Sequence, residues 1–410
     1  MNHPMRLQEP DRSILTAHLH PLPADPLLGL SALYREDPNP QKVDLGVGVY
    51  KDEYGLAPVM QAVKQAEQVW LQTEASKAYI APRGDEEFLA HIETLLLGHS
   101  HPVLRDKRSG SIQTPGGSGA LRIAADFILR CNPNATLWLP NPTWVNHDPL
   151  LERTGLQLKR YPYYDMQRQQ LDFDAMMACL KQVPQGDVVL LHGCCHNPTG
   201  ADLTPGQWRA VSELALQRGF TPFVDIAYQG FAESLDFDAF GLRLLAEQHP
   251  VVIITASCSK NFAIYRERIG SFHVVAPSAP EADICLSQAL DIVRGYYFVP
   301  PTHGGFVVKT ILSHAELKAL WQTELDHTRQ RIIDMRHLFT REAQKAGLGE
   351  RFAHIGRQNG MFSFLGLDEQ QVEQLRQNHS VYMASNSRIN LSGINPENVG
   401  YLMAALQQIS

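Results

Sequence analysis

A lysine stands at the end of an apolar segment in the stretch TASCSKNFAIYRERIG, residues 255–270. The apolar residues 251–254 are typical of a buried strand, so the chain could present Lys260 at the edge of a sheet. An amine held there could act as a nucleophile toward a carbonyl group. A lysine at a strand end is, however, more often only a solvated surface residue. The catalytic interpretation therefore needs other groups in the same place.

A glycine-rich turn, TPGGSG, could supply an anion site. It precedes an apolar helix pattern, so Gly117 would let backbone N–H groups approach an anion and Ser118 would add a hydroxyl. The turn lacks the third glycine of a dinucleotide fingerprint and the GK[ST] of a Walker loop, which favours a single phosphate. Ser257 and Arg268 could complete the cage, because arginine offers two parallel donors to phosphate oxygens. A plain glycine-rich turn is the alternative.

Four more side chains stand at strand ends or in turns. Asp225 ends an apolar segment, where a buried carboxylate needs a positive partner, and Tyr228 follows three residues later. Trp144 follows an Asn-Pro-Thr turn and could lie flat against a ring, and Asn197 lies in the tight turn of HGCCHNPTG. The structural alternatives are a helix-capping aspartate, a core tryptophan and a turn without function.

Together these groups match the chemistry of pyridoxal phosphate. Lys260 would form the covalent link to the cofactor, and Asp225 would pair with its pyridinium nitrogen so that the ring can accept electrons. Asn197 and Tyr228 would bond the ring phenolate, and Trp144 would stack on the ring. We predict no metal at this site.

The elements that would position these residues alternate along the chain. Apolar strand patterns and helix patterns follow one another, and Thr204 with Gln207 predicts a capping box at one helix start. The strands are predicted at 136–140, 186–193, 221–228 and 251–257, and the helices at 204–219, 240–248 and 315–346. This order predicts an α/β fold with a parallel sheet. Ligands bind at the carboxyl ends of such strands, which would gather the residues above into one site.

Composition narrows the class of partner. The chain has 410 residues, of which 36 are Lys or Arg and 43 are Asp or Glu, for a net charge of -7. This mild acidity predicts neither nucleic-acid nor membrane binding. None of the six cysteines forms a CxxC pair, the N-terminal stretch has no apolar signal region, and no apolar run approaches a membrane span. We therefore expect a cytoplasmic protein with reduced thiols.

Eight segments carry a resemblance to a known family: LGVGVYKDE, TPGGSGALR, NPTWVNH, HGCCHNPTG, DIAYQGF, SxSKNF, QNGMFSF and SRINLSG. The chain resembles the class I aminotransferases, in their aspartate and aromatic amino acid branch, from residue 24 to its end. The resemblance implies fold type I of the pyridoxal phosphate-dependent transferases, with a mainly parallel seven-stranded sheet covered by helices and a smaller α/β domain. It also implies a homodimer with sites at the interface. The implied division is an arm at 1–23, a small domain at 24–50 and 321–410, and a large cofactor domain at 51–320.

The resemblance also implies residue roles. Lys260 would be the catalytic base, acting with Asp225 and Tyr228, and His147 would stand behind Asp225. Gly117, Ser118, Ser257 and Arg268 would hold the phosphate, and Tyr79 would reach the phosphate of the neighbouring subunit. Arg388 would clamp the substrate α-carboxylate with Asn197 and Gly48, beside Trp144 and Phe362. Arg294 of the other subunit would bind a dicarboxylate side chain.

Two stretches depart from the family pattern. In GYYFVPPTHGG, Phe298 and Val299 replace polar residues near the substrate side chain, and IAPRG follows Tyr79. These changes put strict aspartate specificity in doubt, although drift in an interface loop would explain them equally. We therefore predict transamination between an L-amino acid, aromatic or aspartate, and a 2-oxo acid such as 2-oxoglutarate. The alternatives are a strict aspartate aminotransferase, a lyase or decarboxylase of the same fold, and a catalytically silent binding protein.

Overall fold

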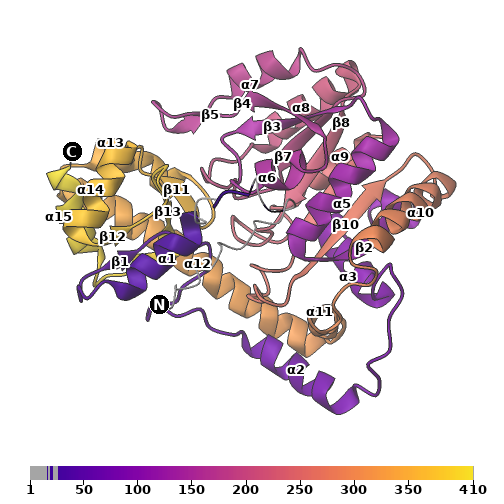
Figure 1. Ribbon diagram of the computed structural model, residues 1–410, viewed down its shortest axis with the longest axis horizontal. Helices are drawn as coiled ribbons and strands as arrows, with labels where there is room; N and C mark the ends of the chain where they lie inside the picture. The colour runs from indigo at the N-terminus through magenta and orange to yellow at the C-terminus, as the bar shows by residue number, and fades with distance from the viewer. Residues whose placement is uncertain (1–15, 17–18, 22–25, 410) are drawn as a thin grey trace, which may run out of the picture.

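A central sheet with helices on both faces forms the larger of two lobes, and a long helix leads from it into the smaller lobe (Figure 1). The computed structural model describes residues 16, 19–21 and 26–409. The predicted arm, 1–23, falls largely outside these residues.

The central sheet has seven strands in the order β2-β10-β9-β8-β7-β3-β4. All neighbouring pairs are parallel except the two that β10 makes, with β2 and with β9. The strands are β2 (Ser109–Pro115), β3 (Thr136–Asn141), β4 (Gln157–Pro162), β7 (Val188–His192), β8 (Thr221–Ile226), β9 (Val252–Ser257) and β10 (Ile269–Val275). The predicted mainly parallel seven-stranded sheet is confirmed.

Neighbouring residues of each strand supply two separate cores. Leu190 and Phe223 pack with helices α5 (Gly116–Cys131) and α10 (Ala279–Tyr296) on one face. Leu191 and Val224 pack in the larger core of the opposite face. Successive side chains of a strand point to opposite faces, so a strand covered on both sides must be apolar throughout. This explains the unbroken apolar run in β7.

Local signals place the predicted helices. In α8 (Pro205–Arg218), the Thr204 side chain accepts from the backbone N–H of Gln207, and the Gln207 side chain accepts in return from the N–H of Thr204. This is the predicted capping box. Helix α9 (Phe240–Gln248) also occupies its predicted residues.

The smaller lobe combines segments from both ends of the chain. Strand β1 (Val43–Asp44) pairs in parallel with β12 (Val381–Tyr382), and β11 (Phe362–Phe364) pairs with β13 (Arg388–Asn390) in antiparallel register. Val43 and Leu45 share a core with apolar residues from 338 to 406. The segment before the large lobe therefore folds with the C-terminal segment.

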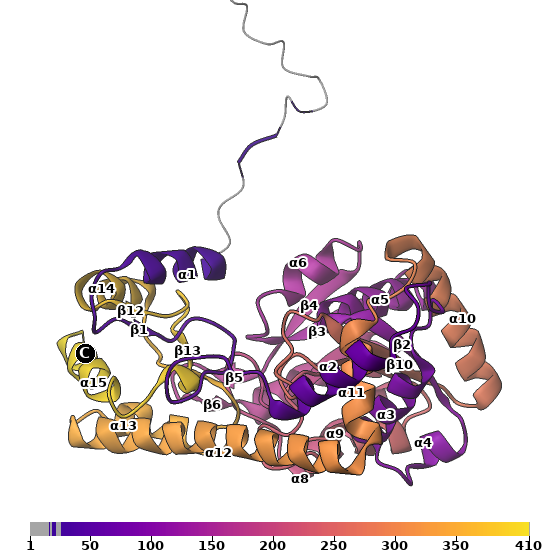
Figure 2. The same ribbon diagram turned by 90° about the horizontal axis from the view of Figure 1, so that it is seen from below.

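Helix α12 (Ala315–Lys345) runs from one lobe into the other (Figure 2). Trp321 and Ile332 pack in the core of the large lobe, whereas Leu338 and Phe339 pack in the core of the small lobe. Both cores therefore share one continuous helix. The predicted domain limits remain a prediction.

The other elements complete the two lobes. They are α1 (Pro26–Glu36), α2 (Gln61–Thr73), α3 (Glu86–Leu97), α4 (Pro102–Arg105), α6 (His147–Glu152), β5 (Tyr164–Asp165), β6 (Gln170–Leu171), α7 (Phe173–Leu180), α11 (His303–Ser313), α13 (Gly349–Phe352), α14 (Glu369–His379), α15 (Val399–Gln408) and 3-10 turns at Ala353–Arg357 and Leu391–Gly393. Among the helices of the described residues, none is both long and apolar enough to cross a membrane.

Candidate active site

A cavity of about 270 Å³ opens at the carboxyl ends of the parallel strands. It gathers polar residues that lie far apart in the sequence, as the sheet topology predicts. The predicted site residues that line it are Gly117, Ser118, Trp144, Asn197, Asp225, Tyr228, Ser257, Lys260 and Arg268.

Lys260 lies in the turn between β9 and β10, and packing holds this turn in place. The indole N–H of Trp321 donates to the Asn261 carbonyl at 2.7 Å, and the ring of Trp321 stacks on Phe262 at 4.5 Å. Burial lowers the pKa of the Lys260 amine to about 8, although the Asp225 charge opposes this shift. This lowered pKa enlarges the neutral fraction of the amine near neutral pH, and the neutral amine is the form that acts as a nucleophile or base.

The start of α5, directly after β2, forms another wall of the cavity. A Cβ on Gly116 would lie 2.5 Å from Nη2 of Arg268, and Gly116 itself has φ of 72°. Only glycine permits both this conformation and the close approach of the guanidinium. Gly117, with Ser257 against it, and Ser118 lie in the first turn of α5, so backbone N–H groups, two hydroxyls and a guanidinium face one hollow. This donor set suits a phosphate group.

Asp225 lies near the end of β8 and is held by two partners. Thr255 on the adjacent strand donates to Oδ1 at 2.7 Å, and Nε2 of His147 lies 3.4 Å from Oδ2. Burial alone would raise the pKa of Asp225, but the hydrogen bond and charge of His147, with smaller contributions from His192 and Thr255, lower it below the usual value. Asp225 is therefore a carboxylate at neutral pH, able to face a cationic ring nitrogen.

A row of side chains behind Asp225 sets the orientation of His147. The Thr143 hydroxyl lies 2.8 Å from Nδ1 of His147 and 3.0 Å from Nε2 of His192. Burial, with the charge of His147, lowers the pKa of His192 to about 3, and Nδ1 of His192 accepts from the backbone N–H of Asn197. His192 is thus neutral and donates through Nε2 to the Thr143 hydroxyl. Thr143 also holds Nδ1 of His147, so that Nε2 of His147 faces the Asp225 carboxylate as a donor.

His192 also lines the cavity, although it was not among the predicted site residues. It stands at the end of β7, directly opposite Asp225 in the register of the two strands. That position was a usable signal, because the same strand-end argument pointed to Asp225. Other lining residues that were not predicted are Leu121, Asn146, Cys194, Ala227 and Ser259.

Tyr228 and Trp144 form aromatic walls of the cavity. The Tyr228 ring lies 5.3 Å from the Lys260 amine and meets Phe362 edge-on at 6.0 Å. Burial strongly raises the pKa of the Tyr228 phenol, so it is a hydrogen-bond donor at neutral pH. Trp144 packs edge-on against His147 at 5.4 Å.

A second cavity, of about 470 Å³, shares Asn146 and Asn197 with the first and reaches Arg388. The Arg388 guanidinium lies 4.4 Å over the Phe362 ring and donates through Nη2 to the Gly46 carbonyl. A Cβ on Gly48 would lie 3.5 Å from the same phenyl ring. The two adjacent cavities thus extend from Lys260 in the large lobe to the buried Arg388 in the small lobe.

Two buried polar atoms beside this boundary lack a partner among the described residues. They are Nε of Arg388 and Oδ1 of Asn197. Leaving such atoms unsatisfied costs about 1–3 kcal/mol each, more for a charged group. A bound carboxylate would accept from Arg388, which suits the substrate role predicted for it.

Five predicted site residues line neither cavity. Gly48, His147 and Phe362 lie beside residues of the site, whereas Tyr79 and Arg294 lie elsewhere. Tyr79 is 83% exposed and contacts Phe298 edge-on, with ring centroids 5.7 Å apart. The guanidinium of Arg294, on α10, lies over the Phe298 ring, 5.8 Å from its centroid. A single chain therefore brings Tyr79 and Arg294 together with Phe298 but not with its own Lys260.

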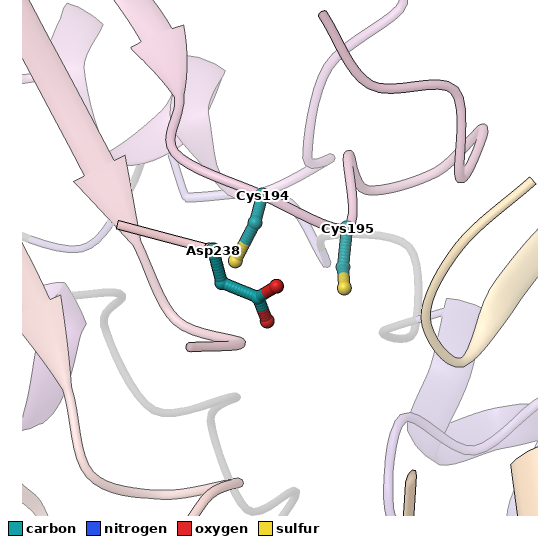
Figure 3. A group of neighbouring side chains, drawn as sticks. All are labelled: Cys194, Cys195 and Asp238. Atoms are coloured by element: carbon teal, nitrogen blue, oxygen red, sulfur yellow. The ribbon is translucent and has the colours of Figure 1, made fainter. Parts of the chain in front are cut away.

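A cluster of metal-ligand types, Cys194, Cys195 and Asp238, also lies in the described part of the chain (Figure 3). The Asp238 carboxylate already accepts from four backbone N–H groups of residues 230–234. Burial raises the pKa of both thiols, to about 11 for Cys195. A metal ion binds the thiolate form of cysteine, whereas both thiols here are protonated and the carboxylate is already hydrogen-bonded. The cluster is therefore poorly suited to bind a metal.

Comparison with known proteins decides the family. The family model for aminotransferase class I and II matches residues 40–406. The chain belongs to this aminotransferase family. The fold and the transaminase activity predicted from the sequence are thereby confirmed, and neither a lyase nor a silent binding protein is favoured.

Individual relatives carry both predicted substrate names. The aminotransferase is 46% identical to an aromatic-amino-acid aminotransferase of Pseudomonas aeruginosa, over 95% of this chain and 97% of that protein. It is 45% identical to an aspartate aminotransferase of Escherichia coli, over 94% and 97%. A solved aromatic-amino-acid aminotransferase of Burkholderia pseudomallei, covalently bound to pyridoxal phosphate, superimposes with a TM-score of 0.94 at 39% identity, over 96% and 99%. Identity therefore does not choose between the two substrate classes.

Proposed function

We propose that the aminotransferase uses pyridoxal phosphate to exchange an amino group between 2-oxoglutarate and either aromatic amino acids or aspartate. The observation that carries this proposal is the meeting of Lys260, Asp225 and a phosphate-sized anion site in one cavity. When bound, the cofactor supplies an aldehyde and an electron-accepting ring. The residues of the chain must then hold that ring, orient the substrate and move one proton.

Each end of the cofactor has a group suited to it. Gly117, Ser118, Ser257 and Arg268 offer donors to the phosphate. The Asp225 carboxylate would stabilise a protonated ring nitrogen, and His147 behind it keeps the carboxylate ionised. Lys260 Nζ would be the nucleophile and the base that moves the proton, because its lowered pKa suits both tasks. Tyr228 and Asn197 would donate to the ring oxygen, and Trp144 would cover the ring.

Arg388 is assigned to the substrate α-carboxylate. Its guanidinium is buried above Phe362 and keeps Nε without a protein partner among the described residues. Asn197 and Gly48 border the same place. Because every amino donor has an α-carboxylate, this contact would be common to both substrate classes.

A homodimer is part of the proposal. Arg294 and Tyr79 line neither of the two cavities described above, and a second copy could receive them. Exposed apolar side chains also include Tyr54, Leu56 and Phe298. Such side chains are typical of surfaces that a partner covers.

Dual substrate use rests on Phe298. This side chain lies between Tyr79 and Arg294 and is 44% exposed. A phenyl ring beside the guanidinium gives an aromatic donor an apolar wall, while the guanidinium itself can bind a distal carboxylate. A strict aspartate aminotransferase is the second candidate, favoured only by the presence of Arg294.

The proposal includes a cytoplasmic location, a large domain at 51–320 and a small domain at 24–50 with 321–410. All six cysteines are free thiols, which suits a reducing compartment. The experiment that tests the function is a panel of L-amino donors with 2-oxoglutarate as acceptor. Turnover of both phenylalanine and aspartate supports the proposal, aspartate turnover alone supports the second candidate, and no amino transfer with any donor contradicts both.

A further inference from the structure

Arg336 is a buried cation on α12, the helix shared by the two lobes, and it lines neither cavity. Its side chain is directed to backbone carbonyls rather than to an acidic partner. The guanidinium donates through Nε to Gly360 at 3.0 Å, through Nη1 to Ile355 at 2.7 Å, and through Nη2 to Asn359, Gly360 and Phe362 at 2.7, 2.8 and 2.6 Å.

These carbonyls belong to residues 355–362, the segment that runs from the 3-10 turn at Ala353–Arg357 to the first residue of β11. Residues 358–361 form neither helix nor strand, so their buried carbonyls need donors from elsewhere. Arginine has five N–H groups in a fixed fork, which lets a single side chain satisfy several carbonyls at once. Burial lowers the pKa of Arg336 only to about 10, so the group remains charged at neutral pH.

The same segment is bonded to the loop that carries Asn197. The backbone N–H of Asn359 donates to the Gly200 carbonyl at 2.8 Å, and its side chain donates to Asp202 at 3.1 Å. Asp202 in turn accepts from the backbone N–H groups of Cys195 and His196, the two residues before Asn197.

The contact between segment and loop is tight. A Cβ on Gly200 would lie 2.6 Å from the Phe362 carbonyl oxygen and 2.9 Å from Nη2 of Arg336. Gly200 also has φ of 71°, which glycine adopts without strain. Segment and loop therefore form one interlocked unit around the guanidinium.

We propose that Arg336 and Asn359 are positioning residues that lock the segment of Phe362 to the loop of Asn197 and so set the spacing of the substrate α-carboxylate site. The proposal rests on the role assigned above to Arg388. β11 begins at Phe362, whose carbonyl Arg336 holds, and Phe364 of β11 pairs with Arg388 of β13. The Phe362 ring also supports the Arg388 guanidinium. A shift of this segment would therefore move Arg388 relative to Asn197.

The test compares two variants with a matched control in the holoenzyme. Arg336→Lys keeps the charge but removes the fork, and Asn359→Ala removes only the side-chain bond to Asp202. Arg329→Lys serves as control, because Arg329 is a shielded arginine on the same helix that donates to a backbone carbonyl, that of Gly230, away from the segment. KM and kcat for aromatic and aspartate donors are measured, with the visible spectrum of the bound cofactor.

Each positioning variant should raise KM about tenfold for both donor classes, change kcat by less than about threefold and leave the cofactor spectrum unchanged. The control should leave all three unchanged. An unchanged KM in folded Arg336→Lys, or a lowered kcat with an altered spectrum, overturns the proposal. Should that variant fail to fold, unchanged KM in Asn359→Ala overturns it instead. Arg388→Lys distinguishes a failure of the assigned substrate site from a failure of this inference. If KM is unchanged in Arg388→Lys, the assigned substrate site is wrong. If KM is raised in Arg388→Lys but unchanged in the two positioning variants, only this inference is refuted.

Discussion

Oδ2 of Asp225 lies 3.4 Å from Nε2 of His147, which can donate to it. The neutral His192 and the Thr143 hydroxyl direct the donor of His147 toward the carboxylate. The carboxylate is therefore kept ionised at a buried position. A fixed negative charge there would stabilise a protonated ring nitrogen without rearrangement of solvent.

Asp225→Ala is expected to lower kcat by about 10²- to 10³-fold, the usual cost of removing a fixed electrostatic partner. Binding of cofactor should persist, since the phosphate donors are untouched. Steady-state kinetics with a saturating donor measures the effect, and a thermal unfolding midpoint close to wild type serves as control. Near-normal kcat would place the cofactor ring elsewhere.

The Lys260 amine is expected to capture pyridoxal phosphate with a pH dependence centred near 8, because burial lowers its pKa to about 8. Below this pH the amine is protonated and cannot attack, so the rate of capture by cofactor-free protein should rise as pH increases through 8. The Asp225 charge raises the pKa of Lys260. Asp225→Asn should therefore move the midpoint to lower pH, and a midpoint near 10.5, the unperturbed value, would contradict the burial argument.

Arg294→Ala is expected to lower kcat/KM for aspartate and glutamate by about ten- to a hundredfold, the cost of about 1.5–3 kcal/mol for a lost charge-assisted bond. Phenylalanine should be affected much less, because it has no distal carboxylate. Phe298→Ser should do the reverse and lower kcat/KM for phenylalanine by roughly tenfold through lost apolar contact. Equal losses for both donors in either variant would remove the basis for dual substrate use.

Thr204→Ala is expected to lower the free energy of unfolding by about 1 kcal/mol, because it removes one half of the α8 capping box. Urea titration measures the change. Thr204 lines neither cavity, so kcat should stay at the wild-type value. The comparison variant is Thr323→Ala, whose hydroxyl bonds only to a carbonyl of its own exposed helix turn, and a loss of the same size there would show that the cap is not the cause.

The cofactor cavity was predictable because its residues stand at strand ends. Asp225, Ser257 and Lys260 each follow an apolar run, and parallel strands bring their carboxyl ends to one edge. The antiparallel direction of β10 had a signal too. Residues 258–268 contain no helix between β9 and β10, and a connection that short does not allow a parallel crossover.

Arg336 and Thr143 could not be identified in this way. Arg336 lies in an amphipathic helix pattern, where arginine usually faces water, and only the folded carbonyl segment shows why it is buried. Thr143 gains its role from the spacing of two histidines on different elements. Both depend on contacts between segments far apart in the chain, which local patterns do not encode.

The proposed function depends above all on Lys260 as the residue that holds the cofactor. Reduction of the purified holoenzyme with borohydride, followed by peptide mapping by mass spectrometry, tests it most directly because the reduced bond survives digestion. We expect the mass of the reduced cofactor on the peptide that contains Lys260, and its loss in Lys260→Ala. A label on a different lysine of the wild-type protein, or a label that persists in Lys260→Ala, would show that Lys260 does not hold the cofactor.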